Sequence, residues 1–284
     1  MKQTVTSALK WTIESWEQPS GSEASQDAEL LWPHPSGTFL RVAVLDGVTP
    51  SAACRTVAGV PGAMYAAAVA RLALQHPQHT LTECALEANG VLHDARLGRS
   101  RDQMQTCVTA ADVYPDGRIE VLRAGDCEAW ARTDDGWVEL GCGTALTEYA
   151  EAAWSDWQHR HPGVDRATRH EGEERFLGHV QAWTSTALGR FATPKLERYT
   201  VHGARELVLA SDGARLSEAV LEDLPGWLGG LRGWERSRSQ LRLAAGKVHD
   251  DVSVLRLLPA PIALPVADRA TVFADADLPR RASA

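Results

Sequence analysis

The sequence predicts an α+β fold in which antiparallel strands form the core. The first observation is a β-meander over residues 104–140, where apolar strand-like runs alternate with turn sequences such as Pro115-Asp116-Gly117. This meander differs from the alternating strand and helix pattern of a doubly wound parallel sheet. The second observation is a pair of helical stretches, roughly 51–76 and 80–97, which we expect to pack on one face of the sheet.

Composition and charge limit the classes of function. The chain has 284 residues, of which 44% are hydrophobic and 23% are charged, and this suits one large domain or two small ones. Its formal net charge of −8 argues against a sequence-wide attraction to nucleic acid or to an anionic membrane. We therefore expect neither nucleic acid nor a membrane as a partner.

The cysteines and the N-terminal sequence predict a soluble cytoplasmic protein. The five cysteines are scattered, odd in number and without CxxC spacing, which favours reduced thiols over a disulfide framework or a zinc ribbon. Residues 1–10 lack the apolar segment of a signal peptide. No apolar run approaches the roughly 20 residues that a membrane helix needs.

Three acidic positions lie at strand ends. Residues 39–48 form a β-branched, apolar run in which Asp46 is followed by glycine, and residues 206–213 end in the same way at Asp212. Asp250 precedes a further strand-like run. In an antiparallel sheet the start of one strand lies beside the end of its neighbour, so the three carboxylates can meet at one edge. Clustered anions repel one another, and a hard divalent cation is the simplest group to hold them.

The rest of the chain is read in order around these strands. Residues 10–19 and 28–32 are predicted strands, and Asp27 lies in the small, polar loop between them. Residues 196–202 predict another strand. The stretch 217–245 is helical but contains Pro225-Gly226 and Gly229-Gly230, which we interpret as interruptions that divide it into two helices.

Domain organisation follows from the less regular segments. Residues 1–258 are expected to form one domain, and residues 259–284 a weakly ordered C-terminal tail. Within the domain, residues 143–183 are rich in Trp, His, Glu and Arg and are interpreted as a variable insertion, with a substrate-gating flap as the alternative.

Five short motifs, in this order and spacing, resemble the metal-dependent (type 2C) serine/threonine protein phosphatases, in their bacterial form. Each is weak alone, and their order over residues 12–258 makes the resemblance fairly specific. The motifs are Ser25-Gln26-Asp27-Ala28, Val44-Leu45-Asp46-Gly47-Val48, Ala124-Gly125-Asp126-Cys127, Leu209-Ala210-Ser211-Asp212-Gly213 and His249-Asp250-Asp251-Val252-Ser253-Val254.

The resemblance implies a four-layer α-β-β-α sandwich, with two antiparallel sheets flanked by helices. It also implies a site for two Mn²⁺ or Mg²⁺ ions at one end of the sandwich. Carried over by position, Asp46 would bridge both ions and the Gly47 carbonyl would bind one of them. The reaction implied is hydrolysis of a phosphomonoester by a water activated between two ions, without a side-chain nucleophile.

The same resemblance assigns the other acidic residues. Asp212 and Asp250 would hold the second ion and would carry catalysis together with Asp46. Asp27 would contribute through bound water, and Asp126 matches a residue that holds a third, weaker ion in many members. Asp251 follows the ligand position and is expected to support the site from behind the ligands.

The sequence departs from the family at the substrate end. An arginine that grips the substrate phosphate is common five residues before the Asp27 position, where this chain has Ser22. Arg55, Arg99 and Arg101 are candidates to replace it. Val48 occupies the position of a histidine found in many eukaryotic members, and Gln105-Thr106-Cys107 replaces the usual glycine-threonine stretch.

These departures leave two alternatives to a phosphatase that acts on phosphoserine or phosphothreonine in proteins. One is a phosphatase-like regulatory or binding protein with little catalysis, and the other is an enzyme for small phosphomonoesters. A dehalogenase-type phosphatase is excluded, because Val44 stands where its nucleophilic aspartate would lie. The sequence also lacks a phosphate-binding glycine loop, HExxH and GxSxG.

Overall fold

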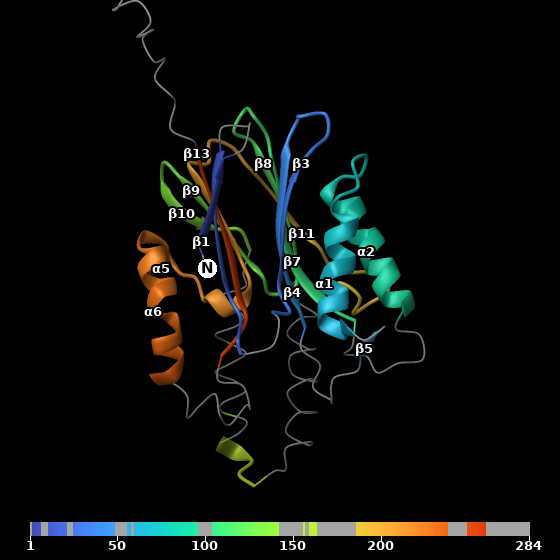
Figure 1. Cartoon of the computed structure of the whole chain (residues 1–284), viewed down its shortest axis with the longest axis vertical. Helices are drawn as coiled ribbons and strands as arrows, with labels where there is room; N and C mark the ends of the chain where they lie inside the picture. Colours follow the sequence, from blue (N-terminus) through green and yellow to red (C-terminus); the bar gives the residue numbers. More distant parts are fainter. Residues whose placement is uncertain are drawn as a thin grey trace, which may run out of the picture.

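The elements of the chain form four layers. The computed structural model describes residues 2–6, 11–21, 25–48, 56–57, 60–95, 104–141, 156, 159–163, 186–237 and 249–259. Figure 1 shows two sheets lying face to face, with one pair of helices outside each sheet. The predicted α-β-β-α sandwich is therefore confirmed.

One sheet has six strands among the described residues, in the order β1-β2-β13-β12-β9-β10. Every neighbouring pair in it is antiparallel. Its strands are β1 (Lys2–Thr6), β2 (Trp11–Gln18), β9 (Glu128–Thr133), β10 (Gly136–Glu139), β12 (Glu206–Ala210) and β13 (Val252–Pro259).

The other sheet has five described strands, in the order β11-β8-β7-β4-β3, and it is also antiparallel. Its strands are β3 (Ala28–Pro33), β4 (Leu40–Gly47), β7 (Thr106–Val113), β8 (Ile119–Ala124) and β11 (Glu197–Val201). A small separate hairpin consists of β5 (Thr56–Val57) and β6 (Val60–Pro61).

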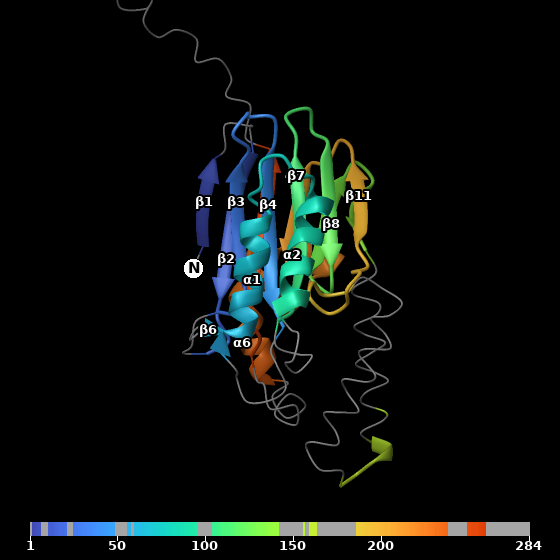
Figure 2. The same ribbon diagram turned by 90° about the vertical axis from the view of Figure 1, so that its right-hand side faces the viewer.

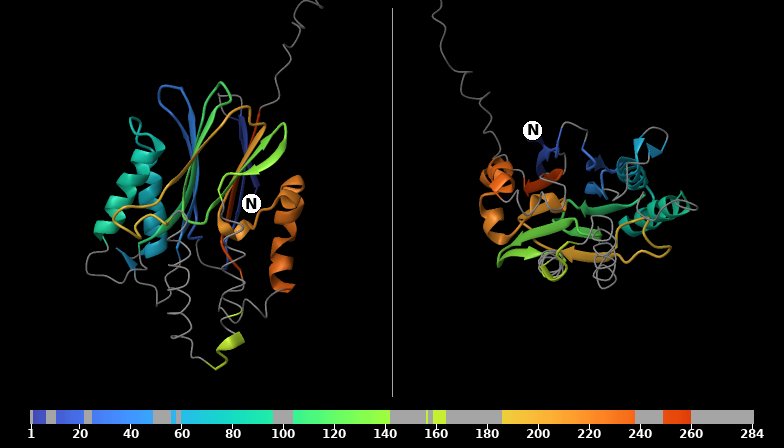
Figure 3. Two further views of the ribbon diagram at one scale, coloured as in Figure 1. Left: turned by 180° about the vertical axis from the view of Figure 1, so that it is seen from behind. Right: turned by 90° about the horizontal axis from the view of Figure 1, so that it is seen from below.

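The helices cover the outer faces of the two sheets. Helices α1 (Gly62–Ala73) and α2 (Leu81–Ala95) lie on the five-stranded sheet, as Figure 2 shows. Helices α5 (Glu218–Glu222) and α6 (Leu224–Ser237) lie on the six-stranded sheet, and the view from below in Figure 3 places the two pairs on opposite sides of the sandwich.

Alternation along β4 shows why this strand lies at the centre of the fold. Val42 and Val44 point into the core between the sheets, whereas Ala43 and Leu45 pack towards α1 and α2. Because successive side chains of a strand face opposite ways, a strand covered on both faces is apolar throughout. This explains the continuous apolar run in the sequence, and it brings the last residues of β4 to the end of the sandwich.

Arg41, also on β4, is fully buried and pairs with Asp112 on β7 through two hydrogen bonds of 2.7 and 2.8 Å. Its remaining donors reach the Leu74 carbonyl at 3.0 Å, the Cys84 sulfur at 3.2 Å and the His79 carbonyl at 3.1 Å. A buried guanidinium is tolerated only when its donors are satisfied. Arg41 therefore fixes the connection between α1 and α2 onto the sheet.

Some predicted element boundaries are wrong. The helix predicted from residue 51 begins only at Gly62, because β6 and the N-cap Pro61 precede it. The two helices predicted between residues 217 and 245 are present, but the break lies at Asp223. Pro225 lies in the first turn of α6, where its missing N–H costs nothing, and Gly229-Gly230 lie within that helix.

Further results concern the ends of the chain, the predicted insertion and the length of the helices. Strand β1 was not predicted, and it adds an edge to the six-stranded sheet. Strand β13 includes Pro259, while residues 260–284 of the expected tail lie outside the described residues. Most of the predicted insertion at 143–183 also lies outside them. Within the described part of the chain, no helix has the length and apolar character needed to cross a membrane.

Candidate metal centre

Asp46 and Gly47 are the last two residues of β4, which runs downwards in Figure 2. They pair with Cys107 and Thr106 on β7, and the Thr106 hydroxyl donates to the Asp46 carbonyl at 2.9 Å. A Cβ on Gly47 would lie only 2.6 Å from the Ala63 carbonyl oxygen. Glycine is therefore required at this position because the start of α1 packs directly against the strand end.

Asp212 and Asp250 come together because β12 and β13 are antiparallel neighbours. Ser211 joins the end of β12 to the start of β13. Its N–H donates to the Ser253 carbonyl at 3.0 Å, and its hydroxyl accepts from the Ser253 N–H at 3.0 Å. A Cβ on Gly213 would lie 2.1 Å from the Asp251 carbonyl oxygen, so the turn after β12 lies against the segment that carries Asp250.

Asp126 lies in the turn between β8 and β9, beside the end of β12, since Ala210 pairs with Glu128. Gly125 adopts φ of +88°, and a Cβ there would lie 2.3 Å from the Cys107 sulfur. The buried Arg123 holds the far side of the turn by donating to the Cys127 carbonyl at 2.8 Å. The glycine and the arginine thus keep Asp126 next to the end of β4.

Asp27 is placed by hydrogen bonds that the sequence did not reveal. The Asp251 carboxylate accepts from the backbone N–H groups of Ser20 at 2.6 Å and Gln26 at 2.9 Å. The Gln26 carbonyl in turn accepts from the Gly47 N–H at 3.3 Å. Asp251 therefore supports the loop before β3, while its expected role behind metal ligands stays a prediction.

The electrostatics show that the acidic residues share one location. Burial raises the pKa of Asp46 well above its usual value, and the charges of Asp27, Asp212, Asp126 and Asp250 raise it further, in that order. The structure therefore places the five sequence-predicted aspartates at the same end of the sandwich, with the other four within electrostatic range of Asp46.

The fold was compared with solved structures. RsbX in complex with magnesium aligns with 91% of this chain and 99% of its own at a TM-score of 0.55 and 9% identity. PppA, a regulatory component of type VI secretion in Pseudomonas aeruginosa, aligns with 87% of this chain and 97% of its own, at a TM-score of 0.52 and 15% sequence identity. The serine/threonine phosphatase Stp1 from Staphylococcus aureus aligns with 87% of this chain and 94% of its own, at a TM-score of 0.51 and 13% sequence identity. The chain has the type 2C phosphatase fold.

This assignment confirms the family resemblance at the level of the fold. The solved structures share little sequence with the chain, and neither a known family model nor a curated protein matches it. The match nevertheless extends over almost the whole of each type 2C structure. The roles of individual residues therefore depend on the geometry of this chain.

The donors at this end of the type 2C fold suit hard divalent ions. Asp27 is 8% exposed, and neither of its carboxylate oxygens makes a hydrogen bond. Burial raises its pKa to about 7, Asp251 and Asp250 add to the rise, and the nearby hydroxyls of Ser211 and Ser253 oppose it without reaching hydrogen-bonding geometry. A buried carboxylate without a partner, among other carboxylates, is well explained by a bound cation.

The cost of this arrangement without a cation follows from the direction of the pKa shifts. A carboxyl whose pKa is raised by folding lowers the stability of the protein as the pH rises from 3.8, the usual value for aspartate, towards about 7 for Asp27. A divalent ion would remove that cost. As the side chains stand, no three His, Cys, Asp or Glu side chains in the described ranges are close enough together to hold an ion.

The two cysteines near the site do not change the choice of ion. Burial raises the pKa of the Cys107 and Cys127 thiols well above the usual value, and nearby carboxylates such as Asp126 and Asp46 add to the rise. Protonated thiols are poor metal ligands. The candidate donors are therefore oxygen atoms, and their binding of ions stays a prediction.

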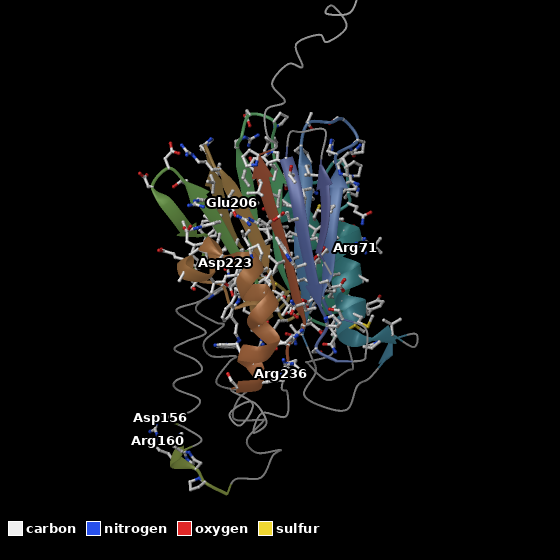
Figure 4. The ribbon with its side chains drawn as sticks, turned by 60° about the vertical axis from the view of Figure 1, so that its left-hand side comes forward. Arg71, Asp156, Arg160, Glu206, Asp223 and Arg236 are labelled. Carbon is white, nitrogen blue, oxygen red and sulfur yellow. The ribbon has the colours of Figure 1, made fainter. Side chains whose placement is uncertain are left out.

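The substrate end is only partly described. Ser22, Arg55, Arg99 and Arg101 lie outside the described residues. Val48 packs against Cys107, Cys127 and Ala187. A pocket of about 510 Å³ lies between the loop before β3 and helix α1, with Asp27 and Arg71 in its lining. Arg71, labelled on α1 in Figure 4, is exposed.

Proposed function

We propose that the chain is a metal-dependent phosphatase that hydrolyses phosphomonoesters, with phosphoserine and phosphothreonine in cytoplasmic proteins as its substrates. The observation that carries the proposal is the gathering of Asp27, Asp126, Asp212 and Asp250 around Asp46 at the end of a type 2C fold. Mutually repelling carboxylates of which Asp27 is buried and the others are half-buried reduce stability unless a cation binds them, so their presence here points to an ion-dependent role.

In this proposal each residue has a definite task. Asp46 would bind two ions, the Gly47 carbonyl one of them, and Asp212 and Asp250 the other. Asp27 would contribute through water, and Asp126 would hold a third, weaker ion. When bound, Mn²⁺ or Mg²⁺ ions lower the pKa of water and neutralise charge that develops on a phosphoryl group.

The protein's own contribution is to orient these groups and to limit their motion. The backbone at Gly47 and Gly213 is in close contact with neighbouring segments, so the two strand ends are held rigidly. Cys107, which pairs with Asp46, and Val48 belong to one apolar cluster. No side-chain nucleophile is needed, because the attacking group is water.

The proposal is tested by turnover on phosphopeptides and on an aryl phosphomonoester, each with Mn²⁺, with Mg²⁺ and with chelator. We expect ion-dependent hydrolysis, abolished by chelator, with kcat/KM at least tenfold higher for phosphoserine or phosphothreonine peptides. Preference for the small ester would instead favour the small-molecule enzyme. Ion binding without turnover would favour the regulatory protein, and neither binding nor turnover would refute the proposed function.

A further inference from the structure

Helix α6 carries a fully buried glutamate at the level of Asp250. Glu235 is 0% exposed. Its carboxylate accepts from Arg232 Nη1 at 2.8 Å and from the Asp250 N–H at 3.3 Å, and it contacts His249 Nδ1 at 2.8 Å. The glutamate therefore holds the backbone N–H of Asp250, a proposed metal ligand, and the side chain of the residue before it.

Arg232, one turn earlier on the same face of α6, binds the carbonyl side of Asp250. Its Nη1 donates to the Asp250 carbonyl at 2.7 Å, and its Nη2 donates to the carbonyls of Gln18 at 2.5 Å and Pro19 at 3.0 Å. The Gln18 side chain returns a hydrogen bond to the Leu228 carbonyl of α6 at 2.8 Å. One arginine thus joins α6, the Asp250 backbone and the end of β2.

The same network extends to the loop that carries Asp27. Immediately after Pro19, the Ser20 N–H donates to the Asp251 carboxylate, which also accepts from the Gln26 N–H. Both ends of the segment between β2 and Asp27 are therefore fixed to residues next to Asp250. We call Arg232 and Glu235, with these backbone contacts, the α6 clamp.

The position of Glu235 is unusual for a residue that serves stability alone. The buried stripe of α6 is Leu224, Leu228 and Leu231, and the next position in that spacing is 235. A leucine there would continue the apolar contact with the six-stranded sheet. A buried ion pair often contributes no more stability than apolar residues of similar size, so its presence calls for another explanation.

We propose that Arg232 and Glu235 are positioning residues that set the ion affinity of the metal centre. They hold the Asp250 backbone from both sides and, through Pro19 and Asp251, the loop that carries Asp27. Without the clamp these segments would have to be ordered when an ion binds, and the entropy lost would weaken binding. This inference rests on the proposed function only in placing the ions at these aspartates.

The test separates positioning from stability. The double variant Arg232→Met/Glu235→Leu fills the same space and completes the apolar stripe of α6. We expect the metal-free variant to stay folded and to unfold cooperatively, because the apolar contact that it gains offsets part of the hydrogen bonds lost by the Asp250, Gln18 and Pro19 backbone. We also expect its Mn²⁺ dissociation constant, measured by isothermal titration calorimetry without substrate, to rise about 10- to 100-fold, as for other residues that orient metal ligands.

Two single variants complete the experiment. Arg236→Met, at the next exposed arginine of α6 (Figure 4), is the matched control and should leave the dissociation constant unchanged. Arg232→Lys keeps a charge and one donor and should give an intermediate loss, which also provides a test if the double variant does not fold. A folded double variant, or a Lys variant, with Mn²⁺ affinity within twofold of the unmodified protein would overturn the inference. If the unmodified protein itself binds no Mn²⁺, the proposed function fails instead.

Discussion

Replacing Asp46 with asparagine is expected to lower Mn²⁺-dependent phosphatase turnover by about three orders of magnitude. This corresponds to a loss of about 4 kcal/mol of transition-state stabilisation, at about 1.4 kcal/mol for each factor of ten. The reason is that Asp46 faces four other aspartates and is the residue proposed to bind both ions. Asparagine keeps the shape of the side chain but carries no charge, so the affinity for the ions falls. Steady-state hydrolysis of a phosphopeptide measures the change, with both proteins at the one Mn²⁺ concentration that just saturates the unmodified protein.

The Asp46 variant has a useful control on stability. Removing one charge from a group of repelling carboxylates relieves an unfavourable interaction, so the metal-free Asn variant should unfold at the same or higher urea concentration. Asp94→Asn, at an exposed position on α2, should change neither activity nor stability. If Asp46→Asn kept more than a tenth of the turnover, the assignment of this strand end as the metal centre would be wrong.

The second large effect is expected on stability, at the buried pair of Arg41 and Asp112. Replacing Asp112 with alanine should lower the free energy of unfolding by about 3–5 kcal/mol, because it leaves a fully buried guanidinium without its charge partner. Burial raises the pKa of Asp112, and the hydrogen bonds and the charge of Arg41 oppose that rise. Arg41 is therefore the main group that stabilises the charged form of Asp112. Urea unfolding followed by circular dichroism measures the loss.

Two variants show whether the loss comes from the unpaired charge. Arg41→Met/Asp112→Leu removes both charges and should recover much of the stability, although the Leu74 and His79 carbonyls lose their donor. Arg71→Met, at an exposed arginine of α1, should alter the free energy of unfolding by less than about 0.5 kcal/mol. A loss below 1 kcal/mol in Asp112→Ala would contradict the structural role given to the pair.

The sequence was most informative for the strands, which follow clear apolar runs separated by turn sequences. Strands of the two sheets follow apolar runs, and an antiparallel arrangement necessarily brings the end of β12 beside the start of β13. The proximity of Asp212 and Asp250 could therefore be predicted from strand ends alone. The expectation that Asp46 meets them at one edge of the same sheet is wrong, because β4 belongs to the five-stranded sheet and only the packing of the two sheets brings its end close to them. The role of all three as ligands remains a proposal. The glycines after Asp46 and Asp212 are explained by backbone contacts that only the fold shows.

Other features were not predictable, for physical reasons that differ. Strand β1 and the β5–β6 hairpin are short, and their pairing depends on neighbours rather than on a pattern of their own. Glycines within α6 suggested a break, but the packing of Leu228 and Leu231 against the sheet outweighs their poor helix propensity. Nothing in the sequence singled out Arg232 and Glu235, because several of their partners are backbone atoms distant in sequence.

The most direct measurement is the number of manganese ions bound by the purified, chelator-treated protein, determined by calorimetric titration with Mn²⁺. The account predicts at least two ions per chain for the unmodified protein, with binding lost or strongly weakened in Asp46→Asn. Binding of no ion, or the same stoichiometry and affinity in both proteins, would contradict the claim that the end of β4 is a metal centre.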